Sequence, residues 1–428
     1  MGRVCGHRLG RPEAYLEIGP GRLHSPRTRR IGKYTGSGGS VGYPFVRTFW
    51  WTAHRRLSGT VPRAPGLYAS KYSHLVLFPV HPSTAARYRQ VFAPSGAKDD
   101  SRDAASLLDL LLHHRSQLRP WQPDTVETRQ LQRLVEQRRL MVNEKTRQSN
   151  RFTACLKMYF PQILQWFDDV TAPVVGALLE RWPSLQELQR AHPGTLKKFF
   201  VQHNGRSLQR IEQRIQAIYQ AVPSTHDPAV LQGEAAAAQG FLALLKTLRE
   251  TIAGLDQQIE QLVAGHPDRA LFASLPGAGP VMVPRLIVAF GTRRQRYDTA
   301  FQMQCYSGIA PVKEASGNSE WVHFRRSCPK FLRQTFHEFA FLSTRSSAWA
   351  KAYYDRQRAQ EQSHPAAIRA LAYKWIRIIF RCWKEGKLYD EQVHLQSLQK
   401  RRSPLGVPNT VVGWKPVAGF QKFSANPS

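Results

Sequence analysis

The sequence has few acidic residues, and the deficit is most marked near its start. Its 428 residues include 30 Asp and Glu against 61 Lys and Arg, which gives a formal net charge of +31 at pH 7. Between Glu17 and Asp99 there is no acidic residue at all. So large a positive charge predicts a polyanionic partner, and nucleic acid is the leading candidate.

Cysteine and long apolar runs are also scarce. The five cysteines are scattered and have no Cys-x-x-Cys spacing, so neither a disulfide framework nor a zinc site is expected. No uninterrupted apolar run is long enough to span a bilayer, and no secretory signal is expected at the start. We therefore expect a cytoplasmic protein with no membrane partner. A hydrophobic content of 42% excludes a wholly disordered chain.

The residue pattern predicts an α+β protein that is mostly helical. Residues 1–69 are rich in Gly, Arg, Pro and Ser and show no sustained period, so irregular structure is expected there. The apolar run HLVLFPVHP at 74–82 predicts a buried strand. After Tyr389 the sequence becomes polar and proline-rich, which predicts a loose tail. The predicted helices are 83–92, 103–114, about 124 to 159, 208–222, 330–346, 348–362 and 363–384.

A long helix is predicted over 228–264, and its second half carries an apolar seam. Leucine and isoleucine alternate there at spacings of four and three, as in the a and d positions of a coiled coil. The seam residues are Leu248, Ile252, Leu255, Ile259 and Leu262. Two interpretations stay open: the seam packs against its own domain, or it forms a homo-oligomer through 228–264.

An unusual concentration of carboxylates follows the acid-free stretch. The sequence KDDSRDA at 98–104 has three aspartates within five residues. Asp100 and Asp103 are three positions apart, so in a helix beginning near Asp99 both project from the first turn to one side. Two such groups suit Mg²⁺ or Mn²⁺. The alternative is helix capping, which the residue pattern alone favours.

A second candidate site lies near residue 316. The stretch APVKEASGNS at 310–319 is followed by His323, Arg325 and Arg326. On a loop, Ser316 could attack a phosphodiester while the two arginines offset the negative charge that develops. The alternative is a simple Ser-Gly-Asn turn, which is the commoner meaning of this triplet.

Gly277 and Gly279 form a third candidate. They lie in SLPGAGPVMVPRLIVAFG, between two apolar segments, where a tight turn is expected. Such a turn can present free backbone N–H groups to a phosphate. A Gly-x-Gly pattern alone is weak evidence, because most such patterns are only turns.

A basic stripe follows one face of the helix predicted at 363–384. Lys374, Arg377, Arg381 and Lys384 are spaced three and four residues apart, opposite an apolar face. The stripe either faces solvent or follows nucleic-acid phosphates.

Five stretches together resemble the insertion-sequence 110 family of bacterial transposases. In chain order they are GAKDDSRDA, NEKTRQSNRFTACLKMYFP, SLPGAGPVMVPRLIVAFG, YSGIAPVKEASG and CPKFLRQTFHEFA. The resemblance covers about residues 71 to 384. It implies a DNA recombinase guided by a structured RNA. The family has a RuvC-like domain of the RNase H type with an Asp-Glu-Asp-Asp metal cluster, then a helical coiled-coil segment, then a transposase domain with a catalytic serine.

The resemblance also assigns roles by position. Asp100 and Asp103 match the last two acids of the cluster, which binds Mg²⁺ (or Mn²⁺), and Ser316 matches the serine nucleophile. Gly277 and Gly279 match the family's Gly-x-Gly turn. Five segments are expected: an irregular 1–69, a partial RuvC-like domain at 70–160, a helical and coiled-coil segment at 161–266, a transposase domain at 267–385 and a polar tail at 386–428.

The first two acids of the family cluster are missing. The family's opening strand ends in Gly-Ile-Asp, and a Glu precedes a later Ser-Arg-Gly; neither motif is present, and Glu13 and Glu17 have no strand-like surroundings. As a hypothesis, residues 1–69 are read out of frame. With one common offset of one base, permitted codons restore the Asp across Arg8 and Leu9 and the Glu across Gly59 and Thr60.

Three functional interpretations compete. The first is a transposase that cleaves and joins DNA through Ser316 with a metal-bound acidic cluster. The second is a decayed copy that binds nucleic acid without recombining it. The third is a nuclease that acts through metal alone. A covalent protein–DNA adduct distinguishes the first from the third.

Overall fold

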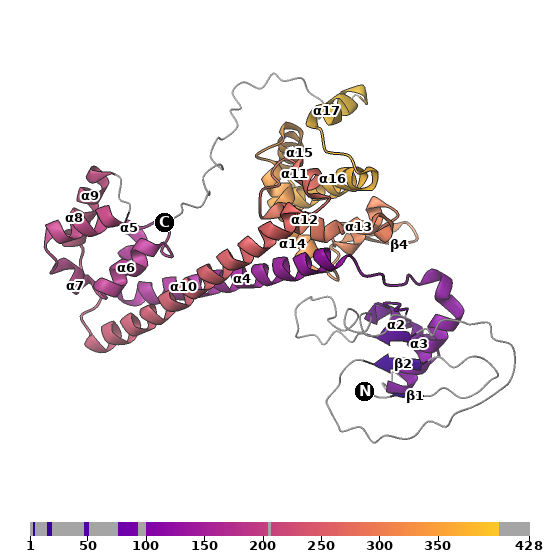
Figure 1. The fold of residues 1–428 in the computed structure, drawn as a ribbon, viewed down its shortest axis with the longest axis horizontal. Helices are drawn as coiled ribbons and strands as arrows, with labels where there is room; N and C mark the ends of the chain where they lie inside the picture. The colour runs from indigo at the N-terminus through magenta and orange to yellow at the C-terminus, as the bar shows by residue number, and fades with distance from the viewer. Residues whose placement is uncertain are drawn as a thin grey trace. The chain divides into compact units, whose positions relative to one another are not determined.

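The computed structural model describes residues 76–92, 100–203 and 207–401, together with three short strands near the N-terminus. These residues are mostly helical, as predicted, with two small sheets (Figure 1). The chain forms two compact units. The first contains Met1–Val126, Ser274–Gly277 and Ala289–Ser428, and the second contains Glu127–Ala273 and Ala278–Val288. The boundaries of the five expected segments stay a prediction.

The three N-terminal strands form a sheet. β1 (Arg3–Val4) pairs antiparallel with β2 (Tyr15–Ile18), and β2 pairs in parallel with β3 (Arg47–Trp50). Helix α3 (Asp100–His114) lies against β2 and β3. The prediction of irregular structure is wrong at these strands, and Glu17 lies within β2. Strands of two to four residues are too short to show a period of two in the sequence.

Glu13 and the four positions of the reading-frame hypothesis lie outside the described residues. Those four positions are Arg8, Leu9, Gly59 and Thr60. The hypothesis therefore stays a prediction.

The apolar run before α2 is buried, but the strand predicted for it is wrong in its described part. There, Leu77 forms an isolated bridge with Trp121, whose N–H donates to the Leu77 carbonyl at 2.6 Å. Leu77 and Phe78 are each 4% exposed. Pro79 follows directly and has no N–H to donate to a ladder, so the pairing does not extend past it into α2.

A small apolar core holds the helix that carries the two aspartates. α2 (Pro82–Phe92) packs against α3. The buried members of this core are Val80, Ala85, Ala104, Leu107 and Leu110. The hydroxyl of Tyr88 on α2 donates to Asp109 on α3 at 2.5 Å, which adds a polar contact between the two helices. A short 3-10 helix, η1 (Arg115–Gln117), follows α3.

Two long antiparallel helices form the framework of the second unit. α4 (Val126–Tyr159) and α10 (Pro228–Ala264) run alongside each other (Figure 1). Side-chain contacts join α4 to α10 and to the turn after it, and residue numbers rise on one side as they fall on the other. The contacting pairs are Thr128–His266, Arg138–Asp256 and Cys155–Glu234. We call this antiparallel pair the α4–α10 arm.

The apolar seam of α10 is partly covered within the chain. Ile259 is 4% exposed, and the other four seam residues are partly buried. Packing against the chain's own helices therefore accounts for part of the seam. An oligomer formed through 228–264 stays a prediction.

Short helices continue the second unit between α4 and α10. They pack around a core that includes fully buried Phe152, Phe160 and Leu178. Ser184 caps α7: its hydroxyl accepts from the Glu187 N–H at 3.3 Å and donates to the Glu187 carboxylate at 3.0 Å. The helices are α5 (Ile163–Trp166), α6 (Pro173–Arg181), α7 (Leu185–Gln189), α8 (Pro193–Gln202) and α9 (Leu208–Gln220).

The remaining elements carry the C-terminal candidates. They are α11 (Arg269–Ala273), α12 (Met282–Phe290), η2 (Arg294–Arg296), α13 (Ala300–Tyr306), β4 (Val312–Ser316), β5 (Ser319–His323), α14 (Lys330–Ser343), α15 (Ala348–Ala359), α16 (His364–Glu385) and α17 (Glu391–Lys400). None of the helices in the described residues has both the length and the apolar content that crossing a bilayer requires.

Buried tryptophans hold α14, α15 and α16 together. The Trp375 indole N–H donates to the Ser343 hydroxyl at 2.7 Å. The Trp375 ring packs against Trp349 and Phe339, with centroid distances of 4.7 and 5.2 Å. The indole N–H of Trp383 donates to the Gly291 carbonyl at 2.8 Å, so the indole N–H groups of Trp375 and Trp383 both have an acceptor.

The loose tail predicted after Tyr389 is wrong at its beginning. The Asp390 carboxylate accepts from the N–H groups of Gln392 and Val393 and thereby caps α17. The Ser347 hydroxyl donates to Glu391 at 2.7 Å. The composition suggested a tail, but a helix cap and one buried contact are enough to dock this segment.

Candidate functional site

The first candidate site is the N-terminal turn of α3. Asp100 is the first residue of α3, and Asp103 lies one turn later. Asp103 is 4% exposed, and its Oδ1 forms an ion pair with Arg89 of α2. Its other oxygen, Oδ2, is buried and has no hydrogen-bond partner. An exposed cap, the alternative reading of this residue, would not be buried in this way.

This arrangement fits part of a divalent-cation site. A buried carboxylate oxygen with no donor is the kind of atom that a hard cation binds. Within the described residues, however, no group of three or more His, Cys, Asp or Glu side chains is arranged to hold a metal ion. Asp103 can therefore contribute one ligand, and the described residues do not complete the coordination shell.

Ser316 lies at the tip of a β-hairpin instead of on a loop. β4 and β5 pair antiparallel, with Ser316 opposite Ser319. Gly317 has φ +55°, and Asn318 is not among the described residues with positive φ, as expected for a type II′ turn. All residues from Lys313 to Phe324 are exposed, so the Ser316 hydroxyl is open to a large substrate.

The predicted cationic pocket around Ser316 is wrong. Directly paired residues share a face, so Ser316 shares its face with Glu314, Trp321 and His323. His323 pairs with Val312, four residues along β4, which places it about 13 Å from the tip at 3.3 Å per residue. Its ring instead contacts Glu314, with Nε2 3.3 Å from Oε2.

Arg325 stabilises the base of the hairpin. Its Nε donates to the Ala310 carbonyl at 3.3 Å, and its Nη2 donates to the Pro311 carbonyl at 3.4 Å. Arg326 is exposed next to it. The extended strands therefore separate the serine from both arginines, which a loop of the same length would not have done.

Gly277 is required by packing. Its φ is +82°, and a Cβ there would lie 3.0 Å from the Leu342 carbonyl carbon and 3.1 Å from the Ser343 nitrogen of α14. Gly279 has open space around it, and its carbonyl accepts the first hydrogen bonds of α12. The turn thus joins α11 to α12 and approaches the α14 backbone closely. Phosphate binding by this turn stays a prediction.

The basic stripe on α16 contains residues with different environments. Arg377 and Arg381 are exposed, and Arg381 pairs with Glu385 at 3.0 Å. Lys374 lies 4.9 Å from the Tyr353 ring centroid, and burial lowers the pKa of its ammonium group. Lys384 donates to the carbonyls of Arg294 and Tyr297. Arg377 is therefore the member best placed to meet a phosphate.

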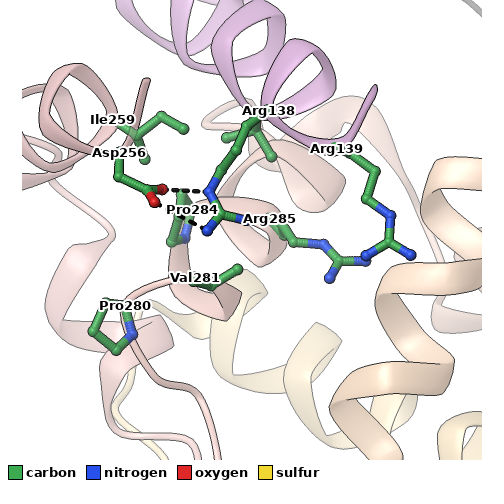
Figure 2. A pocket seen from close by; sticks show the side chains of 9 residues that line it. Arg138, Arg139, Asp256, Ile259, Pro280, Val281, Pro284 and Arg285 are labelled. Carbon is green, nitrogen blue, oxygen red and sulfur yellow. Dashed lines mark hydrogen bonds and ion pairs between the residues drawn. The ribbon is translucent and has the colours of Figure 1, made fainter. Parts of the chain in front are cut away.

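The structure adds a basic pocket that the sequence reasoning missed. Figure 2 shows it at the α4–α10 arm, beside the start of α12. Arg138 pairs with Asp256, and the side chain of Arg285, which is 4% exposed, extends toward Arg139. The sequence signal for this pocket was the single arginine inside the apolar run VPRLIVAF. A charged side chain in a run that will be buried needs polar partners or a pocket.

Two family models match the chain, and both describe transposases. One, described as a transposase, matches residues 63–161, which include Asp100 and Asp103. The other, described as the transposase IS116/IS110/IS902 family, matches residues 269–355, which include Gly277, Gly279 and Ser316. The basic stripe on α16 lies beyond both matches.

Curated relatives cover most of the chain. A candidate mini-circle transposase for IS117 from Streptomyces coelicolor is 26% identical over 325 residues, which are 74% of this chain and 78% of the relative. A 43.6 kDa protein of insertion element IS110 from the same organism is 28% identical over 321 residues, 73% of this chain and 77% of the relative. A pilin gene-inverting protein from Moraxella bovis is 27% identical over 155 residues, 34% of this chain and 47% of the relative. Together these matches show that the chain is similar to transposases of the IS110 family of insertion sequences.

Proposed function

We propose that the chain is a transposase of a bacterial insertion sequence that cleaves and joins DNA through the hydroxyl of Ser316. The observation that carries this proposal is the position of that hydroxyl at an exposed hairpin tip, within a segment matched by a transposase family model. A duplex cannot enter a narrow pocket, so a nucleophile for DNA must project from the surface. The net charge of +31 supplies the attraction for the DNA backbone.

The proposed step is a transesterification at phosphorus. Ser316 Oγ forms a bond to the phosphorus and loses its proton, while the bond from phosphorus to one sugar oxygen breaks and that oxygen takes up a proton. The energy of the phosphodiester is kept in the serine ester, so a second strand can be joined by the reverse step. Arg325 and Arg326 do not meet Ser316, so they would bind flanking DNA.

Asp100 and Asp103 would hold Mg²⁺ (or Mn²⁺) in this proposal. The buried Oδ2 of Asp103 is the atom that supports it. Such an ion supplies positive charge to a phosphoryl group. Arg89 fixes the other oxygen of Asp103 and so orients the carboxylate.

A structured guide RNA, a homo-oligomer through 228–264 and a cytoplasmic location belong to the same proposal. The guide RNA rests on the family resemblance, and the excess of positive charge suits a second polyanion. The oligomer rests on the heptad spacing of α10. Gel filtration with light scattering of the full chain tests the oligomer, and retention of a transcript from the flanks of the gene tests the RNA.

The experiment for the serine uses the full chain and labelled DNA that carries the ends of its own insertion sequence. We expect a covalent protein–DNA band on a denaturing gel with the wild type and none with Ser316→Ala, while DNA affinity stays within about twofold. Ser319→Ala, which alters the paired residue on the other strand, is the matched control and should retain the band. A band that persists in Ser316→Ala and disappears in Ser319→Ala would overturn the assignment.

A decayed copy that only binds nucleic acid is the second candidate. It is favoured by the missing first two acids and by the incomplete carboxylate set of the described residues. Equal DNA binding and equal absence of strand transfer in wild type, Asp103→Asn and Ser316→Ala would establish it. The nucleotide sequence tests the cause: the codons at 8–9 and 59–60 must yield Asp and Glu at one common offset.

A further inference from the structure

Two arginines and a histidine from α14 and α16 form a cluster beside the base of the hairpin. Arg333 and His337 lie one turn apart on α14, and Arg369 lies on α16. Residues four apart share one face of a helix, and α14 packs against α16, so the three groups lie close together. We call them the Arg-His-Arg cluster. None of the three belongs to the site proposed around Ser316.

Phe324 holds the two guanidinium groups of the cluster. It directly follows β5, and the guanidinium carbons of Arg333 and Arg369 each lie 4.4 Å from its ring centroid. Arg333 is fixed further, because its Nη2 donates to the Arg325 carbonyl at 2.7 Å and the Arg326 carbonyl at 2.9 Å. The positions of these cations are therefore set by the protein before any ligand arrives, which favours binding.

Each member of the cluster has a nitrogen with no acceptor. Within the described residues, Arg333 Nε, Arg369 Nε and His337 Nε2 are buried and have no hydrogen-bond partner. In the same residues no ion pair joins Arg333 or Arg369 to a carboxylate. Buried donors are almost always satisfied in native proteins, and a guanidinium group is a strong donor. Two buried guanidinium donors and an unpartnered imidazole nitrogen in one cluster indicate that an acceptor is missing.

An anion with several oxygens would satisfy all three nitrogens. A guanidinium fork matches phosphate geometry, and two forks with an imidazole can surround one tetrahedral group. Burial and the two arginines lower the pKa of His337 to about 4, so the ring is neutral before the anion binds. A bound anion would offset the arginine charges and raise that pKa, so anion binding and proton uptake by His337 would be linked.

We propose that Arg333, His337 and Arg369 bind one phosphate group of a nucleic-acid backbone. The nucleic-acid source rests on the proposed function; the binding of a phosphate anion does not. Phe324 lies at the base of the hairpin and Ser316 at its tip, about 16 Å away along the strands at 3.3 Å per residue. The cluster therefore binds a phosphate that flanks the reacting one and positions the strand. The phosphate that Ser316 would attack is a different one.

The experiment measures DNA affinity of the full chain as a function of salt. One lost phosphate contact lowers the slope of log affinity against log salt by about 0.9. We expect this change for Arg369→Met, and a smaller one for Arg369→Lys, which keeps the charge and loses the fork. Arg345→Met is the matched control, because Arg345 also stacks on a ring, that of Phe341 at 4.9 Å, but is exposed. If Arg369→Met and Arg345→Met give the wild-type slope, the proposal is wrong.

A second measurement separates the sources of phosphate and does not depend on mutation. NMR of the His337 ring gives its pKa in the wild type alone, with inorganic phosphate, and with an oligonucleotide lacking terminal phosphates. A raised pKa with the oligonucleotide at micromolar concentration supports the proposal. If inorganic phosphate raises the pKa of His337 and the oligonucleotide does not, the cluster binds anions but the nucleic-acid backbone is not its ligand. No response to either would overturn the site.

The two proposals fail separately. If the wild type forms a Ser316 adduct but Arg369→Met leaves the salt slope unchanged, the phosphate site is refuted and the serine mechanism stands. If Arg369→Met changes the slope but no adduct forms, the phosphate site stands and the serine mechanism is refuted.

Discussion

Arg89 on α2 forms an ion pair with Asp103 on α3, and the two side chains are 15% and 4% exposed. Removing one partner of a buried pair leaves the other charge uncompensated, typically at about 3–5 kcal/mol. Because Arg89 keeps some exposure, we expect Arg89→Ala to lower the free energy of unfolding of this region by about 2–4 kcal/mol. Hydrogen exchange of the α3 amides measures it.

Arg87→Ala is the control for that change. Arg87 is on the same helix but is exposed, so its loss should change the free energy by no more than about 0.5 kcal/mol. Equal effects of the two substitutions would mean that the ion pair does not stabilise the contact between α2 and α3.

Gly277→Ala should destabilise the protein much more than Gly279→Ala. At Gly277 the new methyl group must adopt φ +82° and meets the α14 backbone at 3.0 Å, whereas at Gly279 it meets nothing within 4 Å. We expect a loss of about 2–4 kcal/mol at Gly277 from left-handed strain and displacement of α14. Urea unfolding followed by tryptophan fluorescence measures it. A stable Gly277→Ala variant with weakened DNA binding would favour the phosphate role instead.

His337 should make stability depend on pH in a defined window. Burial, with the charges of Arg369 on α16 and Arg333 on its own helix, lowers its pKa from 6.5 to about 4. Below pH 6.5 the unfolded chain binds a proton that the folded chain does not, so stability is complete above that pH and is lost as pH falls toward 4. His337→Gln should lose less stability over this window. If the free energy of unfolding changes with pH in the same way in the wild type and in His337→Gln between pH 4 and 7, His337 is not the cause of the pH dependence.

Arg377 and Lys384 should behave differently although they share one stripe. Arg377 is exposed, so Arg377→Ala should lower the salt slope of DNA binding by about 0.9 without affecting stability. Lys384 donates to two backbone carbonyls, so Lys384→Ala should instead lower the free energy of unfolding by about 1–3 kcal/mol. Fluorescence anisotropy and urea unfolding of both variants test the contrast. An unchanged slope in Arg377→Ala would mean that this face is only solvated.

The long helices were the most predictable part of the fold. The predicted 228–264 helix coincides with α10, and the helix predicted from about 124 to 159 is α4. Both have many turns over which an apolar period can repeat, and Asp227 and Pro228 mark the start of α10 by capping. Long-range pairing was not predictable in the same way: the run at 74–82 has strand composition, but in its described part Leu77 forms an isolated bridge with Trp121.

The sequence named candidate site residues but not their arrangement. Residue types and the family resemblance made Asp103 and Ser316 candidates, and their roles stay predictions; neither could show that Arg89 pairs with one and that a hairpin isolates the other. The Gly-Asn pair at 317–318 was a usable hairpin signal, because a glycine in the first turn position suits a type II′ turn. The Arg-His-Arg cluster depends on the packing of α14 on α16, which no local pattern encodes.

The antiparallel pairing of the α4–α10 arm would tolerate a change in its length. Its contacts pair residues whose numbers rise along α4 as they fall along α10. Insertions of equal length at facing positions of the two helices would therefore leave all the existing pairs in contact. Seven residues added to each helix would lengthen the arm by about 10 Å at 1.5 Å per residue and keep the same faces together. Matched insertions could therefore lengthen this arm without altering the hairpin that carries Ser316.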